Sequence, residues 1–287
     1  MKKGKTGITS DCVCDLPQRL LNDYGIEVIP FHIRTESGCF SDITEITSDN
    51  VLEYIAEGHK PISSASTAEE YRAFFEKQLK KHDKLIHITI TSGMSLAFEN
   101  ACRAAEELNG NVTVIDSMHL STGMGQIVIQ AARLAEYGKS TEEIIDFITE
   151  LRERVSTSFI AYSADCLYLN GKISRATAAV CKLFSVHPVL TINRNGQMKL
   201  GGVYVGNYEN AAKKYIAKRL KGCTDIDRSC LFITHAGCST KLLSLIRYEV
   251  ERYNRADKIE ITTASSTVSS NCGPSSFGVL FVHTKKQ

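Results

Sequence analysis

A regular alternation of short β-rich runs with segments of helical period is the feature that most constrains this chain. In the first half, extended runs are expected at residues 6–10, 26–31, 85–90 and 112–116, and helices at 67–81, 94–108, 119–137 and 140–154. Strands that alternate with helices in this way form parallel sheets covered by helices. The first half is therefore predicted to be an α/β domain with a mostly parallel sheet flanked by helices.

The pattern changes near residue 156. Extended stretches at 187–192 and 198–205 are joined through Asn193-Arg194-Asn195-Gly196, and Asn-Gly between extended runs indicates a hairpin. Helices at 172–185, 207–220 and 239–253 are expected to alternate with strands at 231–234, 258–263 and 277–282. We therefore predict two domains: an N-terminal α/β domain over 1–156 and a C-terminal mixed, partly antiparallel α/β domain over 157–287.

Composition excludes several classes of protein. The 287 residues are 43% hydrophobic and carry a formal net charge of +2, which is too small for the basic field of a nucleic-acid-binding protein. The sequence contains no run of about 18 apolar residues, which is the length that would predict a transmembrane segment. The ten cysteines, spread from Cys12 to Cys272 without a CxxC, are expected to be reduced thiols. We expect a soluble cytoplasmic protein.

A hydroxyl-rich turn follows the predicted strand at 85–90. Thr91-Ser92-Gly93-Met94-Ser95 stands directly before a predicted helix. Such a turn offers hydroxyl donors, a glycine that lets a ligand approach the backbone, and N–H groups at the positive end of a helix. It suits a carboxylate or a phosphate, although Ser92 could instead cap the helix.

A second hydroxyl cluster, Ser63-Ser64-Ala65-Ser66-Thr67, stands before the predicted helix at 67–81. Ser66 and Thr67 each have a glutamate three residues later, which is the spacing of a capping box. Ser63 and Ser64 are too far upstream to be caps. The two loops together predict one uncharged anion cradle, in which Ser63, Ser64, Ser92 and Gly93 are candidate ligand-binding residues.

Catalytic and cofactor chemistry find less support. Ser92, Ser95, His235 and Asp116 could in principle form a hydrolase triad, but the elbow sequence GxSxG is missing. No two histidines stand at helical spacing, which would indicate a metal site. GxGxxG does not occur, and Gly123-Met124-Gly125 lies within a predicted helix, where glycine favours close packing. We expect no catalytic residue, no metal and no cofactor.

Two further segments are candidates for the ligand site. Lys172 and Arg175 place cations in the first turns of the predicted helix at 172–185, where they are mildly unfavourable unless an external anion is bound. Asn271 follows the Ser/Thr-rich segment 262–270 and could close over a ligand held by the first domain.

The ordered set of motifs resembles the DegV family, whose members include the fatty-acid-binding subunits of bacterial fatty acid kinase. The motifs that carry this resemblance are Thr9-Ser10-Asp11, Asp15-Leu16-Pro17, Ser63-Ser64-Ala65-Ser66-Thr67, Thr91-Ser92-Gly93-Met94-Ser95, Val114-Ile115-Asp116-Ser117, Gly171–Ser174, His187-Pro188-Val189-Leu190 and Gly273-Pro274. The resemblance covers almost the whole chain. It implies two α/β domains that enclose a long-chain fatty acid such as palmitate.

By position, the resemblance assigns the carboxylate to Ser63 and Ser92. It also implies that the protein is a non-catalytic lipid carrier that presents the carboxyl group to a separate kinase. Three segments depart from the family pattern. Ser63, Ala65 and Ser66 replace the usual Thr, Gln and Pro, and Lys172 stands where Arg is common. Asn271 stands where many members have His, and Ser275 replaces the last Gly of the closing motif. An enzyme acting on a small phosphorylated or carboxylated metabolite in the same cleft is the alternative, and an interaction protein with an empty cleft is a third possibility.

Overall fold

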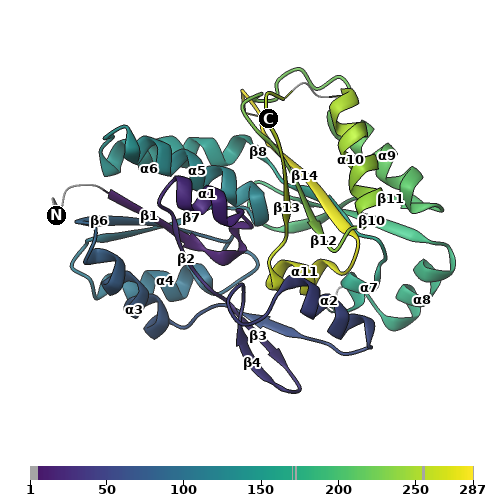
Figure 1. The fold of residues 1–287 in the computed structure, drawn as a ribbon, viewed down its shortest axis with the longest axis horizontal. Helices are drawn as coiled ribbons and strands as arrows, with labels where there is room; N and C mark the ends of the chain where they lie inside the picture. Colours follow the sequence, from purple (N-terminus) through teal and green to yellow (C-terminus); the bar gives the residue numbers. More distant parts are fainter. Residues whose placement is uncertain (1–5, 170, 172, 254–255, 287) are drawn as a thin grey trace.

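The computed structural model describes residues 6–169, 171, 173–253 and 256–286. Within this part of the chain, two large β-sheets stand side by side, one built from the first half of the chain and the other from the second half (Figure 1). None of the described helices is both long and apolar enough to cross a bilayer.

The sheet of the first half has the order β2-β1-β6-β7, and all of its pairings are parallel. Its strands are β1 (Thr6–Asp11), β2 (Glu27–Ile29), β6 (Lys84–Thr89) and β7 (Val112–Asp116). The helices α3 (Ala68–Leu79) and α4 (Ala97–Glu106) cover one face, and α5 (Ser121–Glu136) and α6 (Thr141–Leu151) cover the other. Two short helical segments, η1 (Cys12–Cys14) and α1 (Gln18–Asp23), join β1 to β2. The parallel α/β prediction is confirmed.

Side-chain caps fix where the helices of the first half begin. Capping boxes are formed by Thr67 with Glu70 at α3 and by Ser140 with Glu143 at α6, so backbone N–H groups that the helix leaves unpaired are satisfied. The prediction that Ser66 also serves α3 is wrong. Its hydroxyl donates instead to the Pro30 carbonyl at 2.6 Å.

A small antiparallel sheet in the first half was not predicted. It has the order β4-β3-β5 and is formed by β3 (His32–Thr35), β4 (Gly38–Ser41) and β5 (Ile62–Ser64), with α2 (Ser48–Ala56) between β4 and β5. α2 packs against α11 (Ser266–Cys272), and Leu52 of α2 shares a buried cluster with Ala236 and Cys272. The segment of residues 32–64 therefore places Ser63 and Ser64 near the second half of the chain.

The sheet of the second half is mixed, as predicted. Its order is β11-β10-β9-β14-β12-β13, with β8 also paired to β14, and only the β12–β13 pairing is parallel among those described. Its strands are β8 (Val155–Ser156), β9 (Ser158–Ile160), β10 (Val186–Ile192), β11 (Met198–Val205), β12 (Leu231–Ala236), β13 (Ile259–Thr263) and β14 (Ser276–Val282). The accompanying helical segments are η2 (Arg152–Arg154), α7 (Asp165–Leu169), α8 (Arg175–Leu183), α9 (Tyr208–Leu220) and α10 (Thr240–Tyr253). The β10–β11 hairpin confirms the interpretation of the Asn-Gly turn.

Helix α5 lies between the two large sheets and packs on both β1 and β14. Two glycines make this close approach possible. A Cβ at Gly123 would lie 2.0 Å from Thr157 Oγ1, and one at Gly125 would lie 2.7 Å from the Cys14 carbonyl oxygen. The interpretation of these glycines as packing residues is therefore confirmed.

Candidate functional site

A cavity of about 890 Å³ lies between the two halves of the chain. Its volume is near the upper end of the range for small-molecule sites. The apolar part of its wall includes Phe31, Ile90, Leu120, Phe159, Leu167, Leu190, Met198, Val268, Phe277 and Leu280. The polar part includes Ser63, Ser64, Ser92, Ser95, Ser121, Thr157, Thr234, Gln197, Asn271 and Ser276. The cavity thus combines a long apolar wall with uncharged hydrogen-bonding groups.

The lining carries no full charge in the part of the chain that the structure describes: none of its residues is Lys, Arg, Asp or Glu. His235, at the end of β12, is the basic side chain that lines it, and burial lowers the pKa of its imidazole below the ordinary value. An anion in this cavity would therefore be held by hydrogen bonds rather than by an ion pair with a lining residue.

Ser63 and Asn271, which are 208 residues apart in the sequence, meet at the cavity wall. The Asn271 Nδ2 donates to the Ser63 Oγ at 3.0 Å and also to the Thr267 carbonyl at 2.7 Å. Because the Ser63 oxygen accepts from the amide, its own O–H is directed elsewhere and can donate to a ligand. The structure thus brings two of the predicted ligand-binding residues together.

The turn that contains Ser92 differs from its prediction in one respect. The helix begins only at Ala97, and the Ser95 hydroxyl, one residue before its N-cap Leu96, accepts from the Ala97 N–H at 3.2 Å. The Ser92 N–H donates to Asp116 Oδ2, and the next two N–H groups donate to the hydroxyl and the carbonyl of Thr91. These N–H groups are already used, so the Ser92 hydroxyl is what this turn offers to a ligand.

Gly93 lines the cavity, but the reason for a glycine there is packing as much as ligand access. A Cβ at Gly93 would lie 3.0 Å from the Gly196 carbonyl oxygen, and Thr91 Oγ1 donates to that same oxygen at 2.9 Å. The hairpin turn of the second half therefore sits directly on the serine turn of the first half.

Two other predicted site residues have different outcomes. Ser64 also lines the cavity and is exposed at the end of β5. Lys172 lies outside the described residues. The helix predicted to start there begins at Arg175, where Ser174 caps it by accepting from the Thr177 N–H.

Two buried carboxylates, which no sequence pattern predicted, bind the N-terminal end of the helix that carries Asn271. Asp15 Oδ1 accepts from the Ser265 N–H at 2.8 Å, and the two oxygens of Asp42 accept from the N–H groups of Ser266 and Thr267 at 2.9 and 2.8 Å. The carboxylates therefore sit at the positive end of α11. Burial nevertheless raises the pKa of Asp15 to about 7, although hydrogen bonds to its carboxylate act in the opposite direction.

The residues of the hydrolase hypothesis do not form a triad among the contacts that the structure describes. Asp116 accepts from the N–H groups of Ser92 and Met118, whereas His235 Nδ1 accepts from the Cys238 N–H at 3.4 Å. The carboxylate therefore shapes the serine turn and does not orient the histidine.

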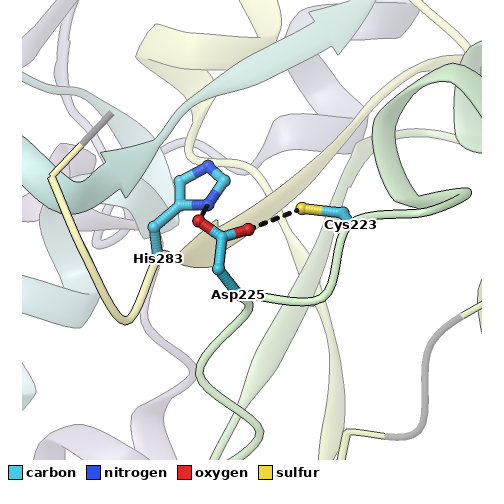
Figure 2. Close-up of side chains that lie close together, drawn as sticks. All are labelled: Cys223, Asp225 and His283. Atoms are coloured by element: carbon cyan, nitrogen blue, oxygen red, sulfur yellow. Dashed lines mark hydrogen bonds and ion pairs between the residues drawn. The ribbon is translucent and has the colours of Figure 1, made fainter.

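Cys223, Asp225 and His283, which are residues of kinds that can bind a metal, lie close together at the end of β14 (Figure 2). No spacing in the sequence predicted this cluster. Asp225 occupies its centre: Cys223 Sγ donates to Oδ1 at 3.2 Å, and His283 Nδ1 lies 3.0 Å from Oδ2. The backbone N–H of Thr284 also donates to the carbonyl of Asp225. These contacts tie the loop after α9 to the strand end, which is a structural role.

Fold and cavity together define a class: a two-domain α/β protein with an uncharged cavity that is lined by apolar side chains and by hydroxyl groups. The family model described as "Uncharacterised protein, DegV family" matches residues 5–284. The chain belongs to the DegV family, and the resemblance found in the motifs is confirmed.

Three relatives illustrate the similarity. A DegV domain-containing protein from Clostridium acetobutylicum is 27% identical over 281 residues, which is 97% of this chain and 98% of that protein. A structure described as "Fatty Acid Binding of a DegV family Protein from Thermus thermophilus" is 25% identical, with a TM-score of 0.85 over 97% of this chain and 99% of that one. A DegV family protein from Eubacterium eligens, loaded with heptadecanoic acid, is 20% identical, with a TM-score of 0.83 over 98% and 100% of the two chains.

Proposed function

We propose that this protein binds one long-chain fatty acid in the 890 Å³ cavity, with the carboxylate at Ser63 and Ser92 and the acyl chain along the apolar wall. The observation that carries the proposal is the cavity lining, which is uncharged throughout its described part and combines apolar side chains with hydroxyl groups. The fatty acids bound by the relatives from Thermus thermophilus and Eubacterium eligens support it.

The energetics assign different tasks to the two ends of the cavity. Burying a chain of about 14 methylenes at about 0.8 kcal/mol each contributes roughly 11 kcal/mol before ordering costs. A hydrogen bond to the carboxylate contributes about 1.5–3 kcal/mol. Affinity therefore comes mainly from the acyl chain, while the hydroxyls of Ser63 and Ser92 fix the orientation of the ligand.

The second part of the proposal is that the protein is a carrier for a partner kinase. The partner would transfer the γ-phosphoryl group of ATP to a carboxylate oxygen, which forms an acyl phosphate and ADP. The cavity supplies donors to the carboxylate, and its described lining does not assemble a nucleophile with a base. Catalysis is accordingly assigned to the partner.

Lipid extraction of the freshly purified protein, followed by mass spectrometry, tests the first part. We expect a C14–C18 monocarboxylic acid at about one per chain. A protein that carries no acyl chain and takes up neither palmitate nor oleate would contradict the carrier proposal.

A second experiment separates the carrier from an enzyme acting on a metabolite in the same cavity. Acyl phosphate should form only when a cognate kinase and ATP are added. If the isolated protein turned over an ester or phosphate substrate, and if His235→Ala abolished that turnover with fatty-acid binding intact, the enzyme would be the better assignment.

A further inference from the structure

A second cavity, of about 320 Å³, lies elsewhere between the two halves of the chain. On one side, α5 contributes Gln130 and Arg133, and Arg154 lies at the end of η2. On the other side, the segment before β12 contributes Asp227, and β13 contributes Glu260. In contrast to the first cavity, this one is lined by charged side chains.

The two arginines of this cavity lack acidic partners. Arg133 donates through Nε and Nη2 to the Tyr24 hydroxyl at 3.1 and 2.9 Å, which is a neutral acceptor. Arg154 makes one long hydrogen bond, 3.4 Å, to the Thr284 carbonyl, and its buried Nε has no hydrogen-bond partner in the described part of the chain. Neither arginine forms an ion pair with any described residue. The positive charges of Arg133 and Arg154 are therefore not neutralised by a described acidic side chain, and an anion in contact with their terminal nitrogens would neutralise them.

The acidic residues in the wall have hydrogen-bond or ion-pair partners other than the two arginines. Asp227 Oδ1 accepts from the Ser229 N–H at 2.8 Å, and Glu260 pairs with both Lys258 and Arg19 at 2.6 Å. The described wall holds three cations, Arg133, Arg154 and Lys258, against two carboxylates, Asp227 and Glu260. The cavity therefore has a net positive charge.

We propose that this second cavity binds a small phosphorylated metabolite, whose phosphate is held by the guanidinium groups of Arg133 and Arg154. Planar guanidinium groups match the oxygen geometry of a phosphate and form strong, charge-assisted hydrogen bonds with it. The Gln130 amide is a further polar group in the wall. The volume is at the lower end of the small-molecule range, which favours a compact ligand. Because both halves form the wall, such a ligand would link them at a second place.

The test is isothermal titration of the full-length protein with inorganic phosphate and with pyrophosphate, at constant ionic strength. Saturable binding is expected, and Arg154→Gln should weaken it by about tenfold or more. Arg247→Gln is the matched control, because Arg247 is exposed on α10 and pairs with Glu251; it should bind phosphate as the wild type does. A parallel titration with malonate distinguishes a phosphate site from a general carboxylate site, and tighter malonate binding would overturn the phosphate assignment.

A second variant guards against loss of folding. Gln130→Glu adds a negative charge to the cavity wall without removing any guanidinium contact described above, and it should also weaken phosphate binding by about tenfold. Fatty-acid binding should survive in both variants, so this experiment is independent of the function proposed for the first cavity. No saturable binding, or binding unchanged by both Arg154→Gln and Gln130→Glu, would overturn the proposal.

Discussion

The contact between Asn271 and Ser63 shows how an uncharged pair can prepare a site for an anion. The amide occupies the Ser63 oxygen, so the serine proton is left for a ligand. The Asn271 amide supplies this donor without a change of charge. The orientation of Ser63 should therefore be independent of pH across the range in which a histidine titrates.

The first prediction concerns the hydroxyls of Ser63 and Ser92. Replacing both by Ala should weaken palmitate binding by roughly 1.5–3 kcal/mol per hydroxyl, because each change removes a charge-assisted hydrogen bond. The melting temperature of the ligand-free protein should change little. Ser37→Ala, in an exposed turn, is the control. A large loss of ligand-free stability with unchanged affinity would show that the serines are structural.

A second prediction at this scale concerns Gly123. Gly123→Ala would place a methyl group 2.0 Å from Thr157 Oγ1, so we expect the free energy of unfolding to fall by about 1–3 kcal/mol. Gly202→Ala is the control, because its new Cβ would have only the end of Lys218 as a neighbour, at 3.8 Å. Chemical denaturation measures both. Equal, small effects would mean that α5 shifts without cost.

At the scale of elements, α11 explains which parts of the site could be predicted from the sequence. The strand ends and the two serine turns were predicted because their signals are local: hydrophobic runs, caps and Asn-Gly. The helix α11 was missed because Ser and Thr are weak helix formers and its N–H groups are satisfied by Asp15 and Asp42, more than 220 residues away. The Ser63–Asn271 contact was missed for a similar reason, because 208 residues separate its two partners in the sequence.

The small sheet of β3, β4 and β5 was missed for a related reason. β5 is three residues long. Its partner β3 is four residues long and is joined to β4 by a short turn. Such strands are stabilised by their contacts with α2 and α11 rather than by their own hydrophobic pattern. Ser63 was correctly predicted not to be a helix cap, but the strand in which it lies was not predicted.

The third prediction uses the pKa of Asp15, which burial raises from 3.8 to about 7. A raised pKa means that the folded state binds the proton more tightly. The resulting stabilisation is complete below pH 3.8 and is lost as the pH rises through about 7. The substitution Asp15→Asn removes this pH-dependent contribution to the free energy of unfolding. Between pH 5 and pH 8, the free energy of unfolding of the wild type should therefore fall by about 2–3 kcal/mol relative to that of Asp15→Asn.

The difference between the two proteins must be measured, because His119 acts in the opposite direction. Burial lowers the pKa of His119 to about 4, so its contribution is present above pH 6.5 and is lost as the pH falls towards 4. This contribution is common to both proteins and cancels in the difference. A stability difference that stays constant from pH 5 to pH 8 would refute the assignment to Asp15.

At the scale of the whole molecule, the two halves share one core. The cluster built around the first sheet also contains Phe232, Leu280 and Val282 from the second half. β8, which ends at Ser156, pairs with β14 of the second sheet. The boundary predicted near residue 156 stays a prediction, and the shared packing argues that the first half does not fold alone.

The fourth prediction follows from this shared core. A fragment of residues 1–156 would leave uncovered the apolar surface that Phe232, Leu280 and Val282 bury. It should bind a hydrophobic dye and melt without a cooperative transition. The full-length protein, treated identically, is the control. A fragment with a sharp transition near that of the full chain would show that the first half is an independent domain.

The last prediction concerns how a ligand in the large cavity affects the whole molecule. Because the wall is formed by both halves, a bound fatty acid stabilises their joint arrangement by RT ln(1 + [L]/Kd), which is about 2.7 kcal/mol at a free concentration of 100 Kd. Palmitate should therefore raise the melting temperature and slow hydrogen exchange in β5 and α11 together. The outer helix α6, which does not line the cavity in the described structure, should change much less. Protection confined to one half would mean that the ligand does not bridge the two halves, and the carboxylate would then have to be assigned to groups other than the Ser63–Asn271 pair.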